Sequence, residues 1–174
     1  MKQDGNGKQT VQDESGIIFS KEPFSFLSGP QRGAFMDNVR FFTFSGGETL
    51  IRGGEMGSMV YFIVSGECGV FLPPPDEKTA VGKLVPGDFF GEMAILANVK
   101  RTATVKTLSE VRVAAMDSQK FKKLFMTDPR VVNGLDEHYK KRQGSLNLVK
   151  KRLARAQTAE KQDLWHKMKK MFTG

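Results

Sequence analysis

Residues 46–71, GGETLIRGGEMGSMVYFIVSGECGVF, decide the fold class of this chain. Short runs rich in β-branched and aromatic residues alternate here with glycine-containing turns, which is typical of β-strands joined by tight connections. The same pattern extends from Val39 to Met116, and no helix-length segment separates the runs. We therefore expect an antiparallel β-roll or jelly roll of about eight strands rather than a parallel α/β fold.

A helix is predicted just before the strand region. Ser28 is a suitable N-cap, Pro30 lies in the first turn, and Gln31 stands at the capping-box position. This combination predicts a short helix over residues 29–39.

Two helices are predicted after the strand region. The apolar spacing becomes helical after Met116, and Asp128-Pro129 ends one helix and begins the next. Gly144 interrupts the second helix, so we expect a bend near residues 143–145. The predicted fold class is therefore α+β, mainly β, with an antiparallel β-roll between an N-terminal helix and C-terminal helices.

Charge and polarity divide the chain into three predicted parts. Residues 1–15 are polar and rich in Gly, Gln and Asp, and are predicted to form a disordered leader. Residues 16–155 are predicted to form one domain. Residues 156–174 are predicted to be a basic amphipathic helical tail, since residues 138–174 contain 11 Lys or Arg against 2 Asp or Glu.

Composition disfavours several classes of protein. Cys68 is the only cysteine, which rules out an intrachain disulfide and cysteine-based zinc sites. Both histidines, His138 and His166, lie outside the strand region, which argues against a metal-dependent jelly-roll enzyme. No catalytic group is recognisable, so we expect a protein that is not an enzyme and holds no metal and no cofactor. Without an apolar run of roughly 20 residues or a signal peptide, a cytoplasmic location is expected, either alone or as the cytosolic part of a membrane protein.

Residues 89–105, FFGEMAILANVKRTATV, contain the candidate binding site. Glu92 and Arg101 stand nine positions apart in a stretch that is otherwise apolar. Arginine remains protonated and can donate to two phosphate oxygens at once. Gly91 allows close approach of the backbone, and N–H groups at the start of a short helix add donors. A carboxylate can accept a hydrogen bond from a ribose hydroxyl.

This segment resembles the phosphate-binding cassette of the cyclic nucleotide-binding domain family. The family pattern is Phe-Gly-Glu, small and aliphatic residues, a turn, then Arg, Ser/Thr/Ala, Ala, Ser/Thr and Val. The matching residues are Phe90, Gly91, Glu92, Ala94, Ile95, Leu96, Arg101, Thr102, Ala103, Thr104 and Val105. Residues 46–71 also resemble the early strands of the family, and the resemblance covers about residues 24–155.

The resemblance implies a role for each residue of the cassette. Arg101 would pair with the cyclic phosphate and Glu92 with the ribose 2′-hydroxyl of cAMP or cGMP. Thr102 would accept a hydrogen bond from the 2-amino group of a syn guanine, which favours or admits cGMP without excluding cAMP. The remaining candidate ligand-binding residues of the roll are Gly91, Met93 and Ala94 through their backbone, Phe90, and Leu84 against the purine.

The resemblance also implies that the last helix closes over the base as a lid. On the offset of channel-type members, Arg142 and Leu146 stand where lid contacts are expected. Purely structural roles remain open for these and the other candidate residues. Glu92 and Arg101 could form a purely structural ion pair, Thr102 could be an ordinary strand residue, and Leu84 and Leu146 could be core residues. Arg142 could simply be a solvated helix residue.

The sequence therefore predicts a regulatory sensor that binds cAMP or cGMP and transmits binding through the lid helix. The alternative is a ligand-free interaction scaffold. In that case residues 148–172 would bind a calmodulin-like partner or an acidic membrane through an apolar stripe with flanking lysines. A nucleic-acid partner is disfavoured, because too few residues follow the lid helix for a helix-turn-helix domain.

Overall fold

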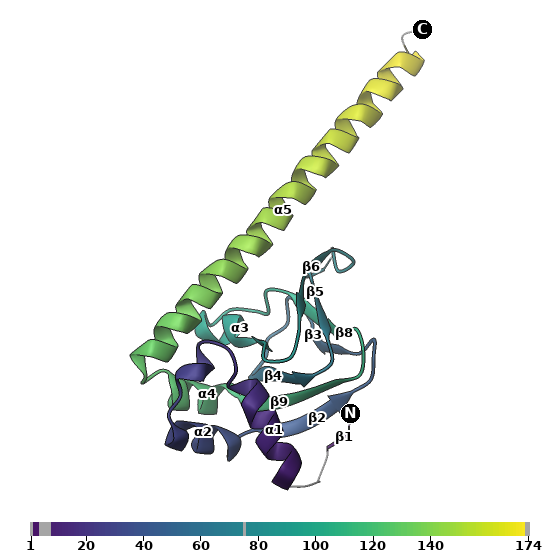
Figure 1. Cartoon of the computed structure of the whole chain (residues 1–174). Coiled ribbons are helices and arrows are strands. Elements are labelled where there is room, and N and C mark those ends of the chain that lie inside the picture. Colours follow the sequence, from purple (N-terminus) through teal and green to yellow (C-terminus); the bar gives the residue numbers. More distant parts are fainter. Residues whose placement is uncertain (1, 4–7, 75, 173–174) are drawn as a thin grey trace. The chain divides into compact units, whose positions relative to one another are not determined.

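The computed structural model describes residues 2–3, 8–74 and 76–172, with side chains over 13–74 and 76–163 (Figure 1). Two antiparallel sheets form the roll, in the orders β1-β2-β9-β4-β7 and β3-β8-β5-β6. The strands are β1 (Lys2–Gln3), β2 (Arg40–Phe44), β3 (Thr49–Ile51), β4 (Met59–Ser65), β5 (Cys68–Phe71), β6 (Ala80–Leu84), β7 (Phe89–Phe90), β8 (Thr104–Thr107) and β9 (Val111–Asp117). This mainly β architecture with flanking helices confirms the predicted fold class.

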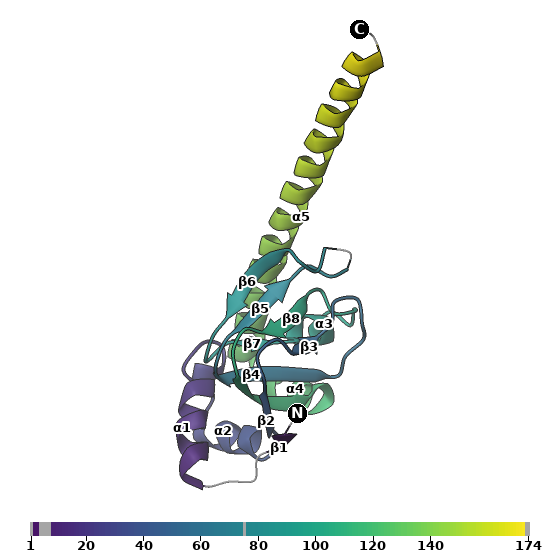
Figure 2. The same ribbon diagram turned by 90° about the vertical axis from the view of Figure 1, so that its right-hand side faces the viewer.

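The helices precede, interrupt and follow these strands. They are α1 (Lys8–Ile18), the 3₁₀ turn η1 (Phe24–Phe26), α2 (Gly29–Met36), α3 (Glu92–Leu96), α4 (Ser118–Phe125) and α5 (Pro129–Phe172). Figure 2 shows α1 and α2 together at the β2–β4 side of the roll. The chain divides into two compact units, residues 1–139 and 140–174, and α5 runs from the first into the second.

Strand β4 is buried on both faces, which explains its uninterrupted apolar sequence. Val60, Phe62 and Val64 belong to a core shared with the helices, whereas Ile63 belongs to a second core between the two sheets. Successive side chains of a strand point to opposite faces, so one strand supplies both cores. Tyr61 packs on the second core from the same side as Ile63.

Phe24 in η1 lies at the centre of the first core. Its ring makes edge contacts with those of Phe62 and Phe89, at centroid distances of 5.0 and 4.9 Å. It also contacts Phe121 and Phe125 of α4, at 6.2 and 5.3 Å. Edge-to-face aromatic pairs contribute beyond simple area burial. The N-terminal segment is therefore an integral part of the helical layer.

The predicted capping of α2 is confirmed. The Ser28 hydroxyl accepts from the Gln31 backbone N–H, and the Gln31 side chain accepts from the Ser28 N–H at 2.8 Å. The helix ends at Met36, three residues earlier than predicted, because Arg40 already begins β2.

The prediction of disorder over residues 1–15 is wrong for residues 2–3, which form β1, and for residues 8–15, which belong to α1. Glu14 is only 4% exposed and pairs with Arg112 of β9, whose guanidinium also lies 5.1 Å from the Phe41 ring centroid. Ile18 then buries its side chain in the first core. The polar composition concealed this helix because its partners lie about 100 residues away in the sequence. Residues 1 and 4–7 of the predicted leader lie outside the described residues.

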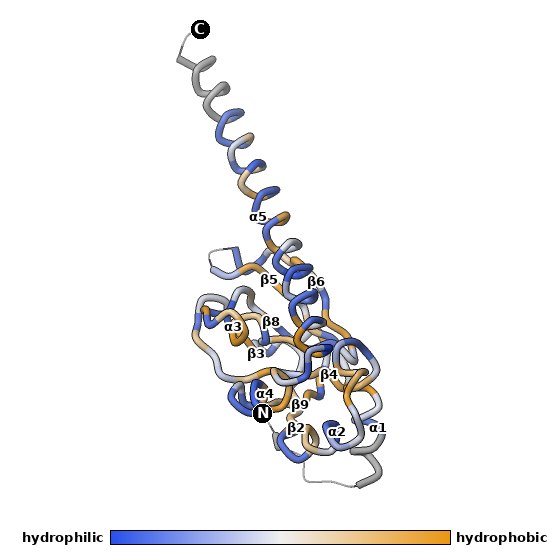
Figure 3. Tube along the Cα trace, turned by 90° about the vertical axis from the view of Figure 1, so that its left-hand side faces the viewer, coloured by the Kyte–Doolittle hydropathy of each residue, from blue (hydrophilic) through white to orange (hydrophobic). Residues whose placement is uncertain are grey.

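The predicted bend at Gly144 is also wrong, since α5 continues from Pro129 to Phe172. A helix-interior glycine costs about 1 kcal/mol, which neighbouring strong helix formers readily offset. The predicted boundary between residues 155 and 156 therefore falls within one helix, and the second compact unit begins at Lys140 instead. Tracing the second unit alone, Figure 3 shows scattered apolar positions among mainly hydrophilic ones up to residue 163. The predicted stripe of Leu164, Trp165, Met168, Met171 and Phe172 lies beyond the described side chains.

No helix among the described residues is both long enough and apolar enough to cross a bilayer.

The buried thiol of Cys68 makes the free energy of unfolding depend on pH in the alkaline range. Its side chain is fully buried in the second core, and burial raises the pKa of the thiol from 9.0 to about 11. The folded state therefore holds the thiol proton more tightly than the unfolded state does. This contribution to stability is complete below pH 9.0 and is lost as the pH rises toward 11.

We expect the free energy of unfolding to fall more steeply with pH for the natural chain than for Cys68→Ala. The difference in slope should approach roughly 1 kcal/mol per pH unit in that window. Urea denaturation of both proteins at a series of alkaline pH values measures it. Parallel pH profiles would show that the thiol does not contribute.

Candidate functional site

The site is built where β7 leads into α3. Phe89 and Phe90 pair with β4, and the chain then turns sharply at Gly91, whose φ of 92° lies in the left-handed region. Glycine adopts this conformation without steric cost. The turn starts α3 at Glu92, and Asn98, with φ of 52°, takes the chain away from the helix end. Two left-handed residues thus bracket the short helix that carries Glu92.

Arg101 lies beside this turn and is held by main-chain oxygens. Its side chain is only 7% exposed. Nη1 donates to the Gly91 carbonyl oxygen at 2.6 Å, and Nη2 donates to the Met59 carbonyl oxygen at 2.8 Å. Charge-assisted hydrogen bonds of this kind are strong and directional. They fix the guanidinium between β4 and the beginning of α3.

The electrostatics of the site centre on this buried cation. Burial lowers the pKa of Arg101, while the Tyr61 phenol and the Glu92 carboxylate act in the opposite direction. Burial raises the pKa of Tyr61, and the positive charge of Arg101 partly offsets the increase. Arginine has so high an intrinsic pKa that it remains protonated. Glu92 is 0% exposed, so the structure places both charges inside the protein.

Three hydrogen bonds join the β3–β4 connection to the segment around Arg101. The Arg101 N–H donates to the Glu55 carbonyl at 2.8 Å, and the Gly54 N–H donates to the Arg101 carbonyl at 2.8 Å. The Gly53 N–H donates to the Thr104 hydroxyl at 3.0 Å. These three bonds fix the register between residues 53–55 and the start of β8.

The remaining predicted residues of the roll lie around this centre. The Thr102 hydroxyl donates to the Met93 sulfur at 3.8 Å, which is a weak hydrogen bond. Met93 and Ala94 are buried on α3. Phe90 stacks on Tyr61 at a centroid distance of 5.1 Å. Leu84 ends β6 and is buried with Phe90 in the second core.

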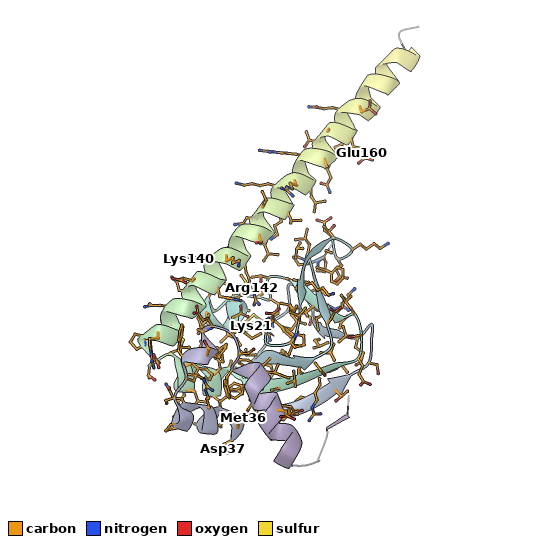
Figure 4. The ribbon with its side chains drawn as sticks, in the orientation of Figure 1. Lys21, Met36, Asp37, Lys140, Arg142 and Glu160 are labelled. Carbon is orange, nitrogen blue, oxygen red and sulfur yellow. The ribbon has the colours of Figure 1, made fainter. Side chains whose placement is uncertain are left out.

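The two predicted lid residues belong to the second unit. Arg142 and Leu146 are four residues apart on α5, and therefore share one face of the helix. Figure 4 labels Arg142 and Lys140 on this helix. Their predicted role as lid contacts stays a prediction.

Two partners of Arg101 escaped the sequence analysis. Met59 contributes only its carbonyl oxygen, which no pattern of side chains reveals. Tyr61 was grouped with the strand residues, although its position opposite Phe90 in the sheet brings it to the buried charge. The phenol oxygen of a tyrosine in a core strand whose other side chains are apolar up to Val64 is the sequence feature that pointed to it.

Within the described part of the chain, no group of three or more His, Cys, Asp or Glu residues is arranged to hold a metal ion.

The sequence profile of the cyclic nucleotide-binding domain family matches residues 41–128 of the 174-residue chain. The matched region contains both sheets from β2 to β9, the Arg101 site and α4. The chain therefore belongs to the cyclic nucleotide-binding domain family.

Several curated relatives share about a third of their aligned residues with this chain. The cAMP-dependent protein kinase regulatory subunit of Mycosarcoma maydis is 36% identical over 106 residues, which span 58% of this chain and 20% of that protein. The cGMP-dependent protein kinase of Eimeria tenella is 38% identical over 86 residues, 49% of this chain and 8% of that protein. The chain thus spans only a small part of these longer relatives.

Solved structures share the fold at lower identity. The regulatory domain of Toxoplasma gondii PKA with cAMP has a TM-score of 0.68 at 24% identity, covering 76% of this chain and 51% of that one. The regulatory subunit of a cAMP-independent protein kinase A from Trypanosoma brucei has a TM-score of 0.67 at 24% identity, covering 80% and 51%. Since one of these is described with cAMP and the other as cAMP-independent, the fold alone does not choose the ligand.

The hydrogen bond from the Gly53 N–H to the Thr104 hydroxyl allows a test of how the β3–β4 connection is held to the start of β8. Thr104→Val keeps a similar shape but removes the oxygen that accepts from the buried Gly53 N–H. An unsatisfied buried donor costs about 1–3 kcal/mol, so the free energy of unfolding in urea should fall by that amount. Thr49→Val, at an exposed position on β3, serves as the matched control and should change stability little. Equal effects of the two substitutions would contradict the assignment.

Proposed function

We propose that this domain is a regulatory sensor that binds cAMP or cGMP through the segment from β7 to the start of β8. The observation that carries the proposal is the buried Arg101 guanidinium, fixed by the carbonyls of Gly91 and Met59. These bonds use two of its five N–H donors, so the same guanidinium has further N–H groups with which to bind an anion. A cyclic phosphate carries one negative charge and presents two free oxygens, which suits this donor set.

The neighbouring groups support a nucleotide rather than a simple anion. Glu92 lies on the first turn of α3 and interacts electrostatically with Arg101. Its carboxylate would accept from the ribose 2′-hydroxyl. The backbone of Gly91, Met93 and Ala94 would line the sugar-phosphate, and Phe90 and Leu84 would supply apolar surface.

The contact between Thr102 and Met93 bears on the choice of base. A threonine hydroxyl has one hydrogen to donate and two lone pairs to accept with. Because the hydrogen is directed to the Met93 sulfur, the lone pairs are available to a donor. The guanine 2-amino group is such a donor, and adenine lacks it. We therefore propose that the site admits cGMP as well as cAMP.

Transmission would depend on α5. A ligand shifts an equilibrium only through its different affinity for two states. Arg142 and Leu146 share a face of α5 and would make contacts with the base in one state only. Residues 148–172 would carry the change to a protein partner or an acidic membrane surface in the cytoplasm. Their described side chains, over residues 148–163, are mainly exposed and include five Lys or Arg against two Asp or Glu.

Ligand binding should raise the melting temperature. At ligand about 100 times Kd the stabilisation is about 2.7 kcal/mol, which corresponds to several degrees for a domain of this size. Differential scanning fluorimetry and isothermal titration with cAMP and cGMP in parallel measure it. Arg101→Ala should abolish the shift because it removes the phosphate donors.

Arg52→Ala is the matched control for Arg101→Ala. Arg52 lies in the same β3–β4 region, but its side chain is half exposed and pairs with Glu55 and Glu77 at the surface. Binding should therefore be unchanged in Arg52→Ala. The absence of any shift with millimolar cAMP and cGMP in the natural chain would refute the sensor proposal. Unchanged binding by Arg101→Ala would refute the role of the guanidinium.

The base contact is tested by Thr102→Ala. Loss of one neutral hydrogen bond should weaken cGMP by about three- to tenfold, and should change cAMP binding little. Titration calorimetry gives both affinities with the same protein preparation. An equal loss for the two nucleotides would show that the hydroxyl does not contact guanine.

A further inference from the structure

We propose that Gly57, in the connection between β3 and β4, positions the Arg101 guanidinium for phosphate by having no side chain. The inference rests on the proposed function and assigns a residue outside the 89–105 segment to the same site. It arises from the close approach of the β3–β4 connection to the edge of Arg101 formed by Nε and Nη2.

The distances show how little space exists. A Cβ atom built on Gly57 would lie 2.3 Å from Nε, 2.4 Å from Nη2 and 2.6 Å from Cζ of Arg101. Ordinary contacts of a Cβ atom begin at 3.4 Å. The backbone of Gly57 therefore packs against the edge formed by Nε and Nη2, and any larger residue would collide with it.

Backbone conformation does not explain the glycine. The described glycines with positive φ are Gly47, Gly54, Gly66, Gly87 and Gly91. Gly57 is not among them, so alanine can adopt its backbone angles. The requirement for glycine at this position is therefore one of space beside the guanidinium. Gly91 also borders Nη1, at 2.7 Å from a built Cβ, but its left-handed φ supplies a second reason for glycine.

The connection cannot easily move away from Arg101. Glu55 and Gly54 are hydrogen-bonded to the Arg101 main chain, and the Ser58 carbonyl accepts from Ser118 N at 2.7 Å. Gly57 is thus fixed from both sides. A Cβ atom would instead push the flexible side chain of Arg101 by about 1 Å. A displacement of that size breaks hydrogen bonds of 2.6 and 2.8 Å to Gly91 and Met59.

The test is Gly57→Ala, titrated with cAMP and with cGMP. We expect both affinities to fall by about tenfold or more, because a misplaced guanidinium loses charge-assisted bonds to the phosphate common to both nucleotides. The melting temperature without ligand should fall by several degrees because the two hydrogen bonds of Arg101 are lost, but the protein should remain folded at the temperature of the titration. A Gly57→Ala protein that is unfolded without ligand would place the role of Gly57 in folding and overturn the inference.

Two control variants separate this effect from general changes. Gly33→Ala introduces the same methyl group in α2, where a built Cβ meets nothing within 4 Å. Met56→Ala alters the adjoining residue of the same connection, whose side chain is 70% exposed. Both should bind nucleotide like the natural chain. If Met56→Ala and Gly57→Ala weakened nucleotide binding equally, any change in the β3–β4 connection would have the same effect, and the inference would be overturned.

A double-mutant cycle with Arg101→Lys shows whether Gly57 acts through Arg101. Lysine has no branched guanidinium held by the Gly91 and Met59 carbonyls, and its flexible end can turn away from a Cβ at position 57. Gly57→Ala should therefore have little further effect in that background. The same loss in both backgrounds would overturn the inference. Natural affinity in Gly57→Ala would also overturn it. A natural chain that binds neither nucleotide would instead refute the proposed function itself.

Discussion

The cost of burying the Arg101 guanidinium is the constraint on which the site depends. A buried charge is tolerated only where hydrogen bonds and opposite charges compensate for lost water. Carbonyl oxygens of Met59 and Gly91 supply the bonds, and Glu92 adds a negative charge. Met59 belongs to β4, whereas Gly91 and Glu92 form the turn into α3. The need to satisfy one cation therefore fixes β4, the turn into α3 and the start of β8 relative to one another.

The sheet connects this site to the helical layer. Phe89 of β7 packs in the core with η1, α2 and α4, while the next residue, Phe90, packs in the core between the sheets. Gly91 follows immediately and places its carbonyl on Arg101. Because side chains alternate along a strand, two consecutive residues of β7 join the helical core to the guanidinium.

Sequence reasoning succeeded where local rules decide structure. The strands between Val39 and Met116 and the capping box at Ser28 follow from residue spacing alone. It failed where distant partners decide. The α1 helix was taken for disorder because its stabilising contacts, such as that of Glu14 with Arg112, join residues far apart in the sequence. Gly144 was taken for a bend because a propensity cost of about 1 kcal/mol was weighed without the helix formers around it.

By itself, the sequence determined the fold class, the family resemblance and the occurrence of Glu92 and Arg101 in one short segment, because strand periodicity and motif spacing are local properties of the chain. Only the tertiary structure decided what surrounds the guanidinium. The carbonyl of Met59, the phenol of Tyr61 and the bare backbone of Gly57 reach Arg101 from 40 or more residues away. Met59 contributes a main-chain oxygen, Tyr61 contributes a phenol placed by its position in the strand, and Gly57 contributes the absence of a side chain. These groups come next to Arg101 only when β4 and its preceding connection fold against the start of β8.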